Sequence, residues 1–179
     1  MRALLFLLVL AAAAVRALEV VHPVGAALER VAEGDAAAAA LSSRRMRLLV
    51  ALRKANVDAL SRLHADVSSP ASPKFRRFLP MADVVGLTRP PADAAAAVHR
   101  WIAARGVPAD RVRESASGDL LYVDASAHEI GQLLETRMGV FRDTRRPGRL
   151  VVHHDGRYTL PDDVAEHVEL LAGHEDVLL

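Results

Sequence analysis

The chain has 179 residues and a formal net charge of +1, from 23 Lys and Arg against 22 Asp and Glu. This length fits one domain with a short extension, and the balanced charge gives no basic field for nucleic acid. A hydrophobic content of 51% excludes wholesale disorder, and 4% aromatic residues exclude a stacking platform for single strands. The lack of cysteine excludes disulfides, thiolate zinc sites, iron–sulfur clusters and cysteine nucleophiles.

Residues 1–17 have the pattern of a secretion signal. Met1 and Arg2 form a basic start, an apolar run follows, and Val15 and Ala17 supply the small or apolar residues of a cleavage site. The run is shorter than the roughly 20 residues that cross a bilayer. We therefore expect cleavage after Ala17, no membrane anchor in the mature form, and an extracellular or lysosomal/vacuolar location. Without disulfides, the mature protein depends on its core or on a partner for stability.

Residues 18–43 are rich in alanine and of low complexity. Val24, Ala27, Leu28 and Val31 have helical spacing, and an alanine run covers 36–40. We expect a leader segment or a weakly held helix here.

From residue 44 onward, periodic apolar residues predict alternating strands and helices. Residues 45–53 read as a strand, and residues 57–67 as a helix capped by Asn56. A loop rich in Ser and Pro ends that helix at 68–73. Phe75, Phe78 and Leu79 are expected to be apolar anchors of this loop, and a short helix is expected over 81–87.

The second half predicts another helix between Pro90 and Gly106, followed by a hairpin of two strands over 112–115 and 120–124. Ser126 and Glu129 form a capping box that starts a further helix. Strands are expected over 138–142 and 150–153, and a short helix after Pro161. This order predicts an α+β open sandwich, in which helices cover one face of a single antiparallel sheet. The uncovered face of such a sheet is a natural docking surface.

The chain offers no catalytic, cofactor-binding or metal-binding constellation. It lacks a nucleophile elbow, phosphate-binding and dinucleotide-binding glycine motifs, and a His-Glu-x-x-His motif. His153, His154 and Asp155 are the densest possible metal group, but neighbours on a strand point to opposite faces, which favours polar residues at a turn. Glu129 is explained by capping. The eight histidines allow two interpretations, a pH-dependent switch or surface residues of no special role.

Several short motifs, taken in order, resemble a known domain. They are Leu49–Asn56, Val67–Phe75, Phe78-Leu79, Pro90, Trp101-Ile102, Gly106, Leu120–Val123, Leu133-Leu134, Phe141, Tyr158–Val164 and Gly173. Together these motifs resemble the activation (pro-) domain of the sedolisin family of serine-carboxyl peptidases, the family of kumamolisin and tripeptidyl peptidase I. The resemblance covers residues 44–177.

The resemblance implies a ferredoxin-like fold similar to that of subtilisin-type propeptides. It also implies a module that assists folding of a sedolisin-type catalytic domain, inhibits it, and is released at acidic pH. The partner is that catalytic domain, in cis if the gene continues or in trans. The family's catalytic Gly-Thr-Ser and Glu-x-x-x-Asp motifs do not occur in this sequence, so the chain itself is expected not to be an enzyme.

The same resemblance suggests where the domain docks and how it is released. Because the C-terminal stretch would lead into the family's linker, docking is expected at Arg157, Tyr158, Leu160 and Pro161. The expected pH-sensing residues are His153, His154, His167 and His174. An alternative remains open, in which a stand-alone secreted binding or inhibitor protein uses the same fold.

Overall fold

The computed structural model describes residues 17–21, 27–31, 34–174 and 176–177. The helices are α1 (Asp35–Ser43), α2 (Val57–Ser68), α3 (Met81–Thr88), α4 (Ala92–Ala104), α5 (Ala127–Leu133), α6 (Asp162–Ala165) and the 3-10 helix η1 (Ala109–Arg111). The strands are β1 (Ala17–Val21), β2 (Leu28–Arg30), β3 (Arg45–Leu52), β4 (Val112–Glu114), β5 (Leu120–Ser126), β6 (Met138–Asp143), β7 (Leu150–His154), β8 (Arg157–Pro161), β9 (Val168–Ala172) and β10 (Asp176–Val177).

The centre of the protein is a four-stranded antiparallel sheet with the strand order β4-β5-β3-β9. The hairpin β4–β5 and the strand β9 lie on opposite sides of β3, the first strand of this sheet in the chain. This is the order of a split βαβ domain, in which β3, the helices before β4, the hairpin, α5 and β9 follow one another. The α+β fold expected from the sequence is confirmed, and the order of the strands agrees with a ferredoxin-like domain.

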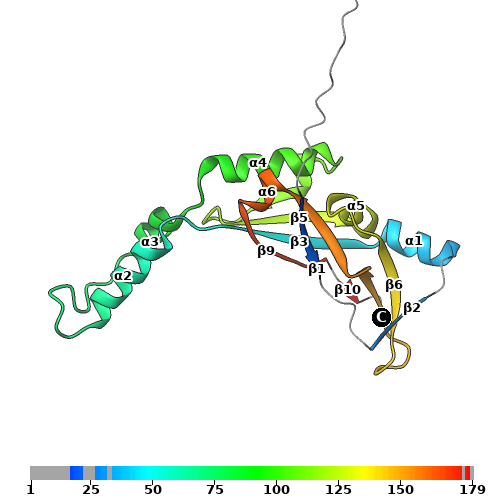
Figure 1. Ribbon diagram of the computed structural model, residues 1–179, viewed down its shortest axis with the longest axis horizontal. Coiled ribbons are helices and arrows are strands. Elements are labelled where there is room, and N and C mark those ends of the chain that lie inside the picture. Colours follow the sequence, from blue (N-terminus) through cyan, green and yellow to red (C-terminus); the bar gives the residue numbers. More distant parts are fainter. Residues whose placement is uncertain (1–16, 22–26, 32–33, 175, 178–179) are drawn as a thin grey trace, which may run out of the picture.

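Alternation along the strands divides this sheet into a buried face and an uncovered one. In β3, Met46, Leu48, Val50 and Leu52 are buried, whereas the residues between them are partly or fully exposed. The buried residues pack against Val98, Trp101 and Ile102 of α4 and against α5. Figure 1 shows α4, α5 and α6 together on one side of β3 and β5. The helices therefore cover one face of the sheet, as the sequence pattern predicted.

The prediction of a single sheet is wrong, because the described strands form three. A second four-stranded sheet has the order β10-β7-β6-β2, and β1 pairs with β8. The predicted pair of strands over 138–142 and 150–153 exists, as β6 and β7. Segments distant in the sequence extend this pair at both edges, an arrangement that local periodicity does not reveal.

The helices α2 and α3 form an arm that projects away from the sheets (Figure 1). At its base, the Asn56 side chain donates from Nδ2 to the Leu87 carbonyl at 2.9 Å, and the Ala55 amide donates to Thr88. Asn56 stands at the expected N-cap position but has left-handed backbone, and its side chain forms no cap hydrogen bond. Phe75, Phe78 and Leu79 are exposed, so the prediction that they anchor the loop is wrong.

The described residues before 44 differ from a single weak helix. β2 occupies part of the stretch that has helical spacing, because its residues pair with the edge strand β6. The alanine run lies in α1, which contacts α5 and β6. Apart from Ala17, which begins β1, the proposed signal peptide lies outside the described residues. Within the described part of the chain, no helix is both long and apolar enough to cross a membrane.

Candidate docking surface

The uncovered side of the central sheet is a mostly apolar surface. Its side chains form two rows across the strands. The strand register places Leu49 beside Tyr122 and Ala172 in one row, and Ala51 beside Leu120 and Leu170 in the other. Leu170 is 56% exposed, and the others are partly buried. We call these six side chains the open face: Leu49, Ala51, Leu120, Tyr122, Leu170 and Ala172. Leu170 lies on the edge strand β9, and an exposed leucine that continues an apolar sheet face is typical of an interaction surface.

A charged group borders one end of the open face. Asp124 of β5 accepts from Arg47 Nε of β3 at 3.0 Å and from Arg113 Nη2 of β4 at 3.3 Å. The hydrogen bond from Arg47 is the main reason that the pKa of Asp124 lies below its usual value. These exposed pairs contribute little to stability but fix two guanidinium groups beside the apolar rows. The surface can therefore contact an apolar partner with acidic groups at its rim.

The structure places the predicted docking residues of the C-terminal stretch in β8, which pairs with β1. Tyr158 and Leu160 are buried and belong to the core. Arg157 is exposed. Pro161 is partly buried and lines a surface hollow of ≈ 500 Å³ together with Trp101 of α4. Tyr158 and Leu160 are therefore structural residues in the free chain.

Three of the four predicted pH-sensing histidines meet inside the protein. His154 is fully buried, and His153 and His174 are buried as well. The ring centroid of His154 lies 4.5 Å from that of His153 and 5.0 Å from that of His174. Tyr158 contacts His154 and His174, with centroids at 5.5 Å in both cases. We call His153, His154 and His174 the histidine cluster.

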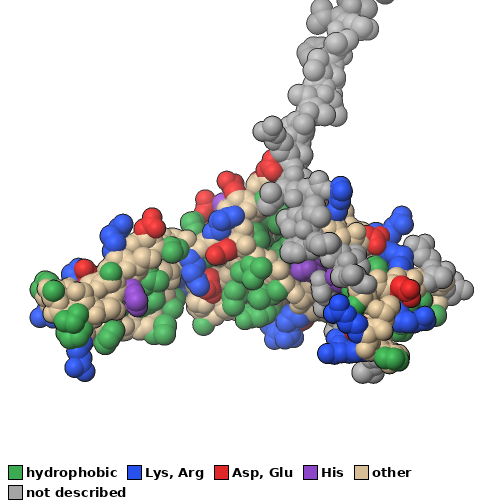
Figure 2. Space-filling view, turned by 60° about the horizontal axis from the view of Figure 1, so that its bottom comes forward, with side chains coloured by type: hydrophobic (Ala, Val, Ile, Leu, Met, Phe, Trp, Pro, Cys, Tyr) green, Lys and Arg blue, Asp and Glu red, His purple; other side chains and the backbone are tan. Residues whose placement is uncertain are grey.

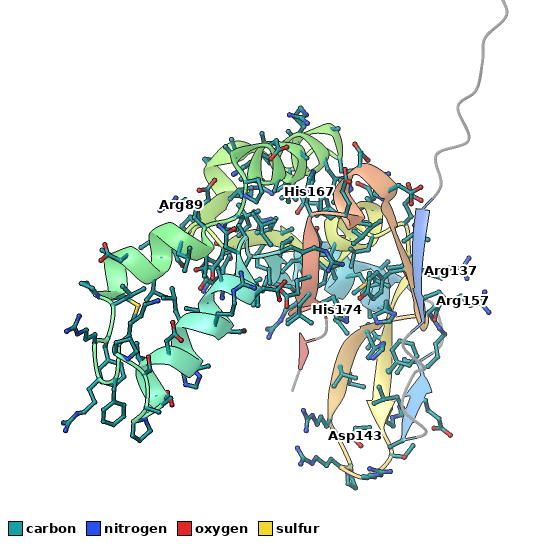
Figure 3. All side chains as sticks on the ribbon, turned by 60° about the vertical axis from the view of Figure 1, so that its left-hand side comes forward. Arg89, Arg137, Asp143, Arg157, His167 and His174 are labelled. Atoms are coloured by element: carbon teal, nitrogen blue, oxygen red, sulfur yellow. The ribbon has the colours of Figure 1, made fainter. Side chains whose placement is uncertain are left out.

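Burial of the histidine cluster corrects one interpretation of the sequence and refines another. The expectation that His153 and His154 are surface residues at a turn is wrong, because both lie at the end of β7 in the interior. Their rings approach although they are neighbours on a strand. His167 is not part of the cluster; its Nε2 lies 3.6 Å from Glu166 Oε1. Figure 3 shows His167 and His174 at opposite ends of β9.

Other ionisable groups lie beside the cluster. The Tyr158 ring of β8 packs against it, and burial raises the pKa of the Tyr158 hydroxyl. Asp155 follows β7 and forms an ion pair with Arg30 of β2, while its amide donates to the Arg137 carbonyl. Nowhere in the described ranges do three or more His, Asp or Glu side chains form a group suited to a metal ion.

The sequence predicted that the uncovered face of the sheet is a docking surface, but it did not identify the residues of the open face. Its strongest signal is the alternation in β3, where Leu49 and Ala51 sit between residues of the buried face. The sequence did not predict strand β9, because Glu169 and Leu170 are both exposed and interrupt the alternation of buried and exposed residues that is typical of a strand. A bulge between Ala51 and Leu52 accompanies this irregularity.

The strand order and the uncovered apolar face define the class, a small α+β domain of the split βαβ type. The sequence matches the family "Pro-kumamolisin, activation domain" over residues 34–177, and the chain belongs to this family. The match begins before the boundary expected at residue 44 and includes α1. An activation domain is the non-catalytic part of its peptidase.

The similar proteins are peptidases of the sedolisin family. The chain is 28% identical to physarolisin of Physarum polycephalum over 123 residues, which is 69% of the chain and 21% of physarolisin. It is 32% identical to tripeptidyl-peptidase 1 of Canis lupus familiaris over 133 residues, 74% of the chain and 23% of that protein. Aorsin of Aspergillus oryzae is 25% identical over 120 residues, 67% of the chain and 18% of aorsin. The chain thus spans about a fifth of the length of these relatives.

Proposed function

We propose that this chain is the propeptide of a sedolisin-type peptidase and binds the catalytic domain through its open face. The family match over 34–177 carries the proposal. The structure supplies a suitable surface, since an apolar sheet face with Leu170 exposed at 56% stands opposite the helix-covered face. Binding would remove this surface from water, the main favourable contribution in protein association.

The bound propeptide inhibits the catalytic domain and assists its folding, whether the two belong to one chain or to two. The test uses residues 18–179 with the catalytic domain of tripeptidyl-peptidase 1, refolded and assayed at pH 7. The expected results are a higher yield of refolded peptidase and dose-dependent inhibition of peptide hydrolysis. An unchanged yield of refolded peptidase, together with full peptide hydrolysis in a large excess of propeptide, would contradict the proposal.

We further propose that acid releases the propeptide through the histidine cluster. Histidine side chains gain a proton between pH 5 and 8, and placing a charge in the interior of a protein is unfavourable. Charged rings 4.5–5.0 Å apart also repel one another. The cluster joins β7 to the segment that follows β9, and Tyr158 of β8 packs against it. Its protonation would therefore loosen both the second sheet and the edge of the first.

The acid step is tested by inhibition at pH 7 and at pH 4. We expect weaker inhibition at pH 4, and a smaller difference between the two values in His174→Phe, whose ring cannot take up a proton. His64→Gln is the control, because His64 is exposed on α2 and its variant should keep the full difference. Equal potency of the unaltered chain at both values would contradict acid release. An unchanged difference in His174→Phe would exclude protonation of His174 as its cause.

Entry into the secretory pathway completes the proposal. It is supported by the signal pattern of residues 1–17 and by the relatives, which are peptidases of this family. Expression of the full chain in secreting cells, followed by N-terminal sequencing of the medium, tests it. We expect Leu18 as the first residue. Retention inside the cell with Met1 intact would contradict it.

A further inference from the structure

The arm carries exposed apolar side chains far from the core. Phe78 is 72% exposed and Met81 75%, and Phe75 and Leu79 are about two fifths exposed. We call these four residues the arm tip. They occupy the loop after α2 and the first residue of α3. An ordered group of exposed aromatic and aliphatic side chains on a soluble domain marks an interaction site.

The loop that carries the arm tip is held in a defined conformation. The Arg76 amide donates to the Val67 carbonyl of α2 at 2.9 Å, and Phe75 donates to Ser72 at 3.0 Å. Lys74 Nζ lies 2.8 Å from Asp66 Oδ2 of α2. Arg76 has a left-handed backbone, φ 61°, which is unfavourable for a residue with a side chain. The loop therefore presents its apolar side chains in a fixed arrangement before any partner binds, which lowers the entropic cost of binding.

Basic residues accompany the apolar ones. Lys74, Arg76 and Arg77 are all exposed within the same loop. A partner that covers Phe78 and Met81 would therefore fit best if its apolar hollow had acidic groups at the rim. The open face has the same character, with Arg47 and Arg113 beside its apolar rows.

The arm tip and the open face are arranged so that one large partner can contact both. In Figure 2, hydrophobic side chains gather at the far end of the arm and again over the sheet, on the same visible face of the molecule. The relatives are four to five times as long as the matched segment, since that segment is only 21–23% of physarolisin and of canine tripeptidyl-peptidase 1. The catalytic domain is thus large enough to extend from one surface to the other.

We propose that the arm tip is a second docking site for the catalytic domain, which it contacts in an acidic-rimmed apolar hollow. This inference rests on the proposed function. Two linked contacts raise affinity more than either alone, because the second forms at high effective concentration. They also allow stepwise release, because acid can loosen the contact of the open face, near the histidine cluster, while the arm tip stays bound to the catalytic domain.

The test compares the double variant Phe78→Ser/Met81→Ser with the unaltered chain for inhibition of tripeptidyl-peptidase 1 at pH 7. We expect the inhibition constant to rise about 10- to 100-fold, because two buried apolar side chains are lost from the complex. The melting temperature should not fall, since both side chains are exposed in the free chain. Val57→Ser is the matched control, because Val57 is 52% exposed at the base of the arm.

Each result has a distinct meaning. Equal inhibition by the double variant and the unaltered chain would overturn the inference and leave the proposed function intact, whereas no inhibition by either would overturn both. Arg77→Glu should slow association and reduce its dependence on salt. Flotation with phosphatidylserine vesicles tests whether the arm tip binds a membrane instead of the catalytic domain. Vesicle binding that the double variant loses, with unchanged inhibition, would assign the arm tip to a lipid surface and overturn the inference.

Discussion

Gly173 fixes the close approach of the C-terminal segment to the central sheet. Its φ is +77°, and a Cβ at this position would overlap the carbonyl oxygen of Arg47 on β3. Both the left-handed backbone and the steric overlap exclude a side chain. The residue that follows is His174, so this approach also positions the histidine cluster.

We expect Gly173→Ala to lower the free energy of unfolding by at least about 3 kcal/mol, from strain and overlap together. Gly148→Ala is the control, because Gly148 has φ +83° but open space around it. It should cost only about 1–2 kcal/mol, the penalty of the left-handed backbone. Urea denaturation at pH 7 measures both. Equal losses would show that Gly173 does not approach β3.

Asp119 is the clearest source of pH-dependent stability outside the histidines. Hydrogen bonds from Ser117, Lys54 and Ser115, the first being the strongest, lower its pKa from 3.8 to about 2. Since the folded pKa is the lower one, its stabilisation is present above about pH 4. It is lost as the pH falls from about 4 toward 2.

Asp119→Asn should therefore destabilise the protein by about 1–2 kcal/mol at pH 7, a value reduced for partial screening by solvent. The difference from the unaltered chain should shrink to a small remainder near pH 2, where the carboxyl is protonated in the unfolded chain and about half protonated in the folded one. Urea titrations at pH 7 and near pH 2 measure it. A difference that is the same at both values would contradict this assignment.

At the scale of elements, α5 is tied to the sheet by its N-cap residue Ser126, which is also the last residue of β5. Ser126 Oγ accepts from the Glu129 amide at 3.2 Å, and Glu129 Oε2 accepts from the Ser126 amide at 2.7 Å. Glu129 also meets Arg111 Nη1 at 3.0 Å. The helix start thus holds together β5, α5 and the segment before β4.

Ser126→Ala should lower the free energy of unfolding by about 1–2 kcal/mol, since a buried cap is lost. Ser43→Ala is the control, because the Ser43 hydroxyl donates only to the Ala39 carbonyl at the exposed end of α1. Its effect should stay within about 0.5 kcal/mol. Thermal unfolding measures both. An unchanged free energy of unfolding in Ser126→Ala would show that the capping box contributes nothing to stability.

Features determined by neighbouring residues were predictable from the sequence. The capping box of Ser126 and Glu129 is confirmed, and so is the alternation that buries Leu48 and Val50 in β3. These features depend on spacings of two to four residues, which a sequence displays directly.

Features determined by distant pairing were not predictable. β2 has helical spacing but forms a strand, because β6 offers it an unpaired edge. The histidine cluster unites the end of β7 with a residue twenty positions later, and no local pattern places these rings together. Phe75, Phe78 and Leu79 were expected to anchor their loop, because a sequence does not show whether an apolar residue packs on its own chain or on a partner.

At the scale of the whole molecule, the open face, the arm tip and the histidine cluster have separate positions, and we propose a separate task for each. The first two face outward and are apolar with basic neighbours, so they suit one large partner. The histidine cluster lies inside, where the central sheet meets the second one. Binding and its acid release would thus depend on different residues, which allows single substitutions to separate the two.

The central claim is that the open face binds the catalytic domain, and the inhibition constant of Leu170→Asp at pH 7 tests it most directly. Leu170 is exposed, so the charge should leave folding intact but place a carboxylate in the proposed interface. We predict at least about a tenfold weaker inhibition of tripeptidyl-peptidase 1. Ala96→Asp, on the exposed side of α4, should inhibit as the unaltered chain does. Equally weakened inhibition by both variants would contradict the claim. Unchanged inhibition by both variants would contradict it too.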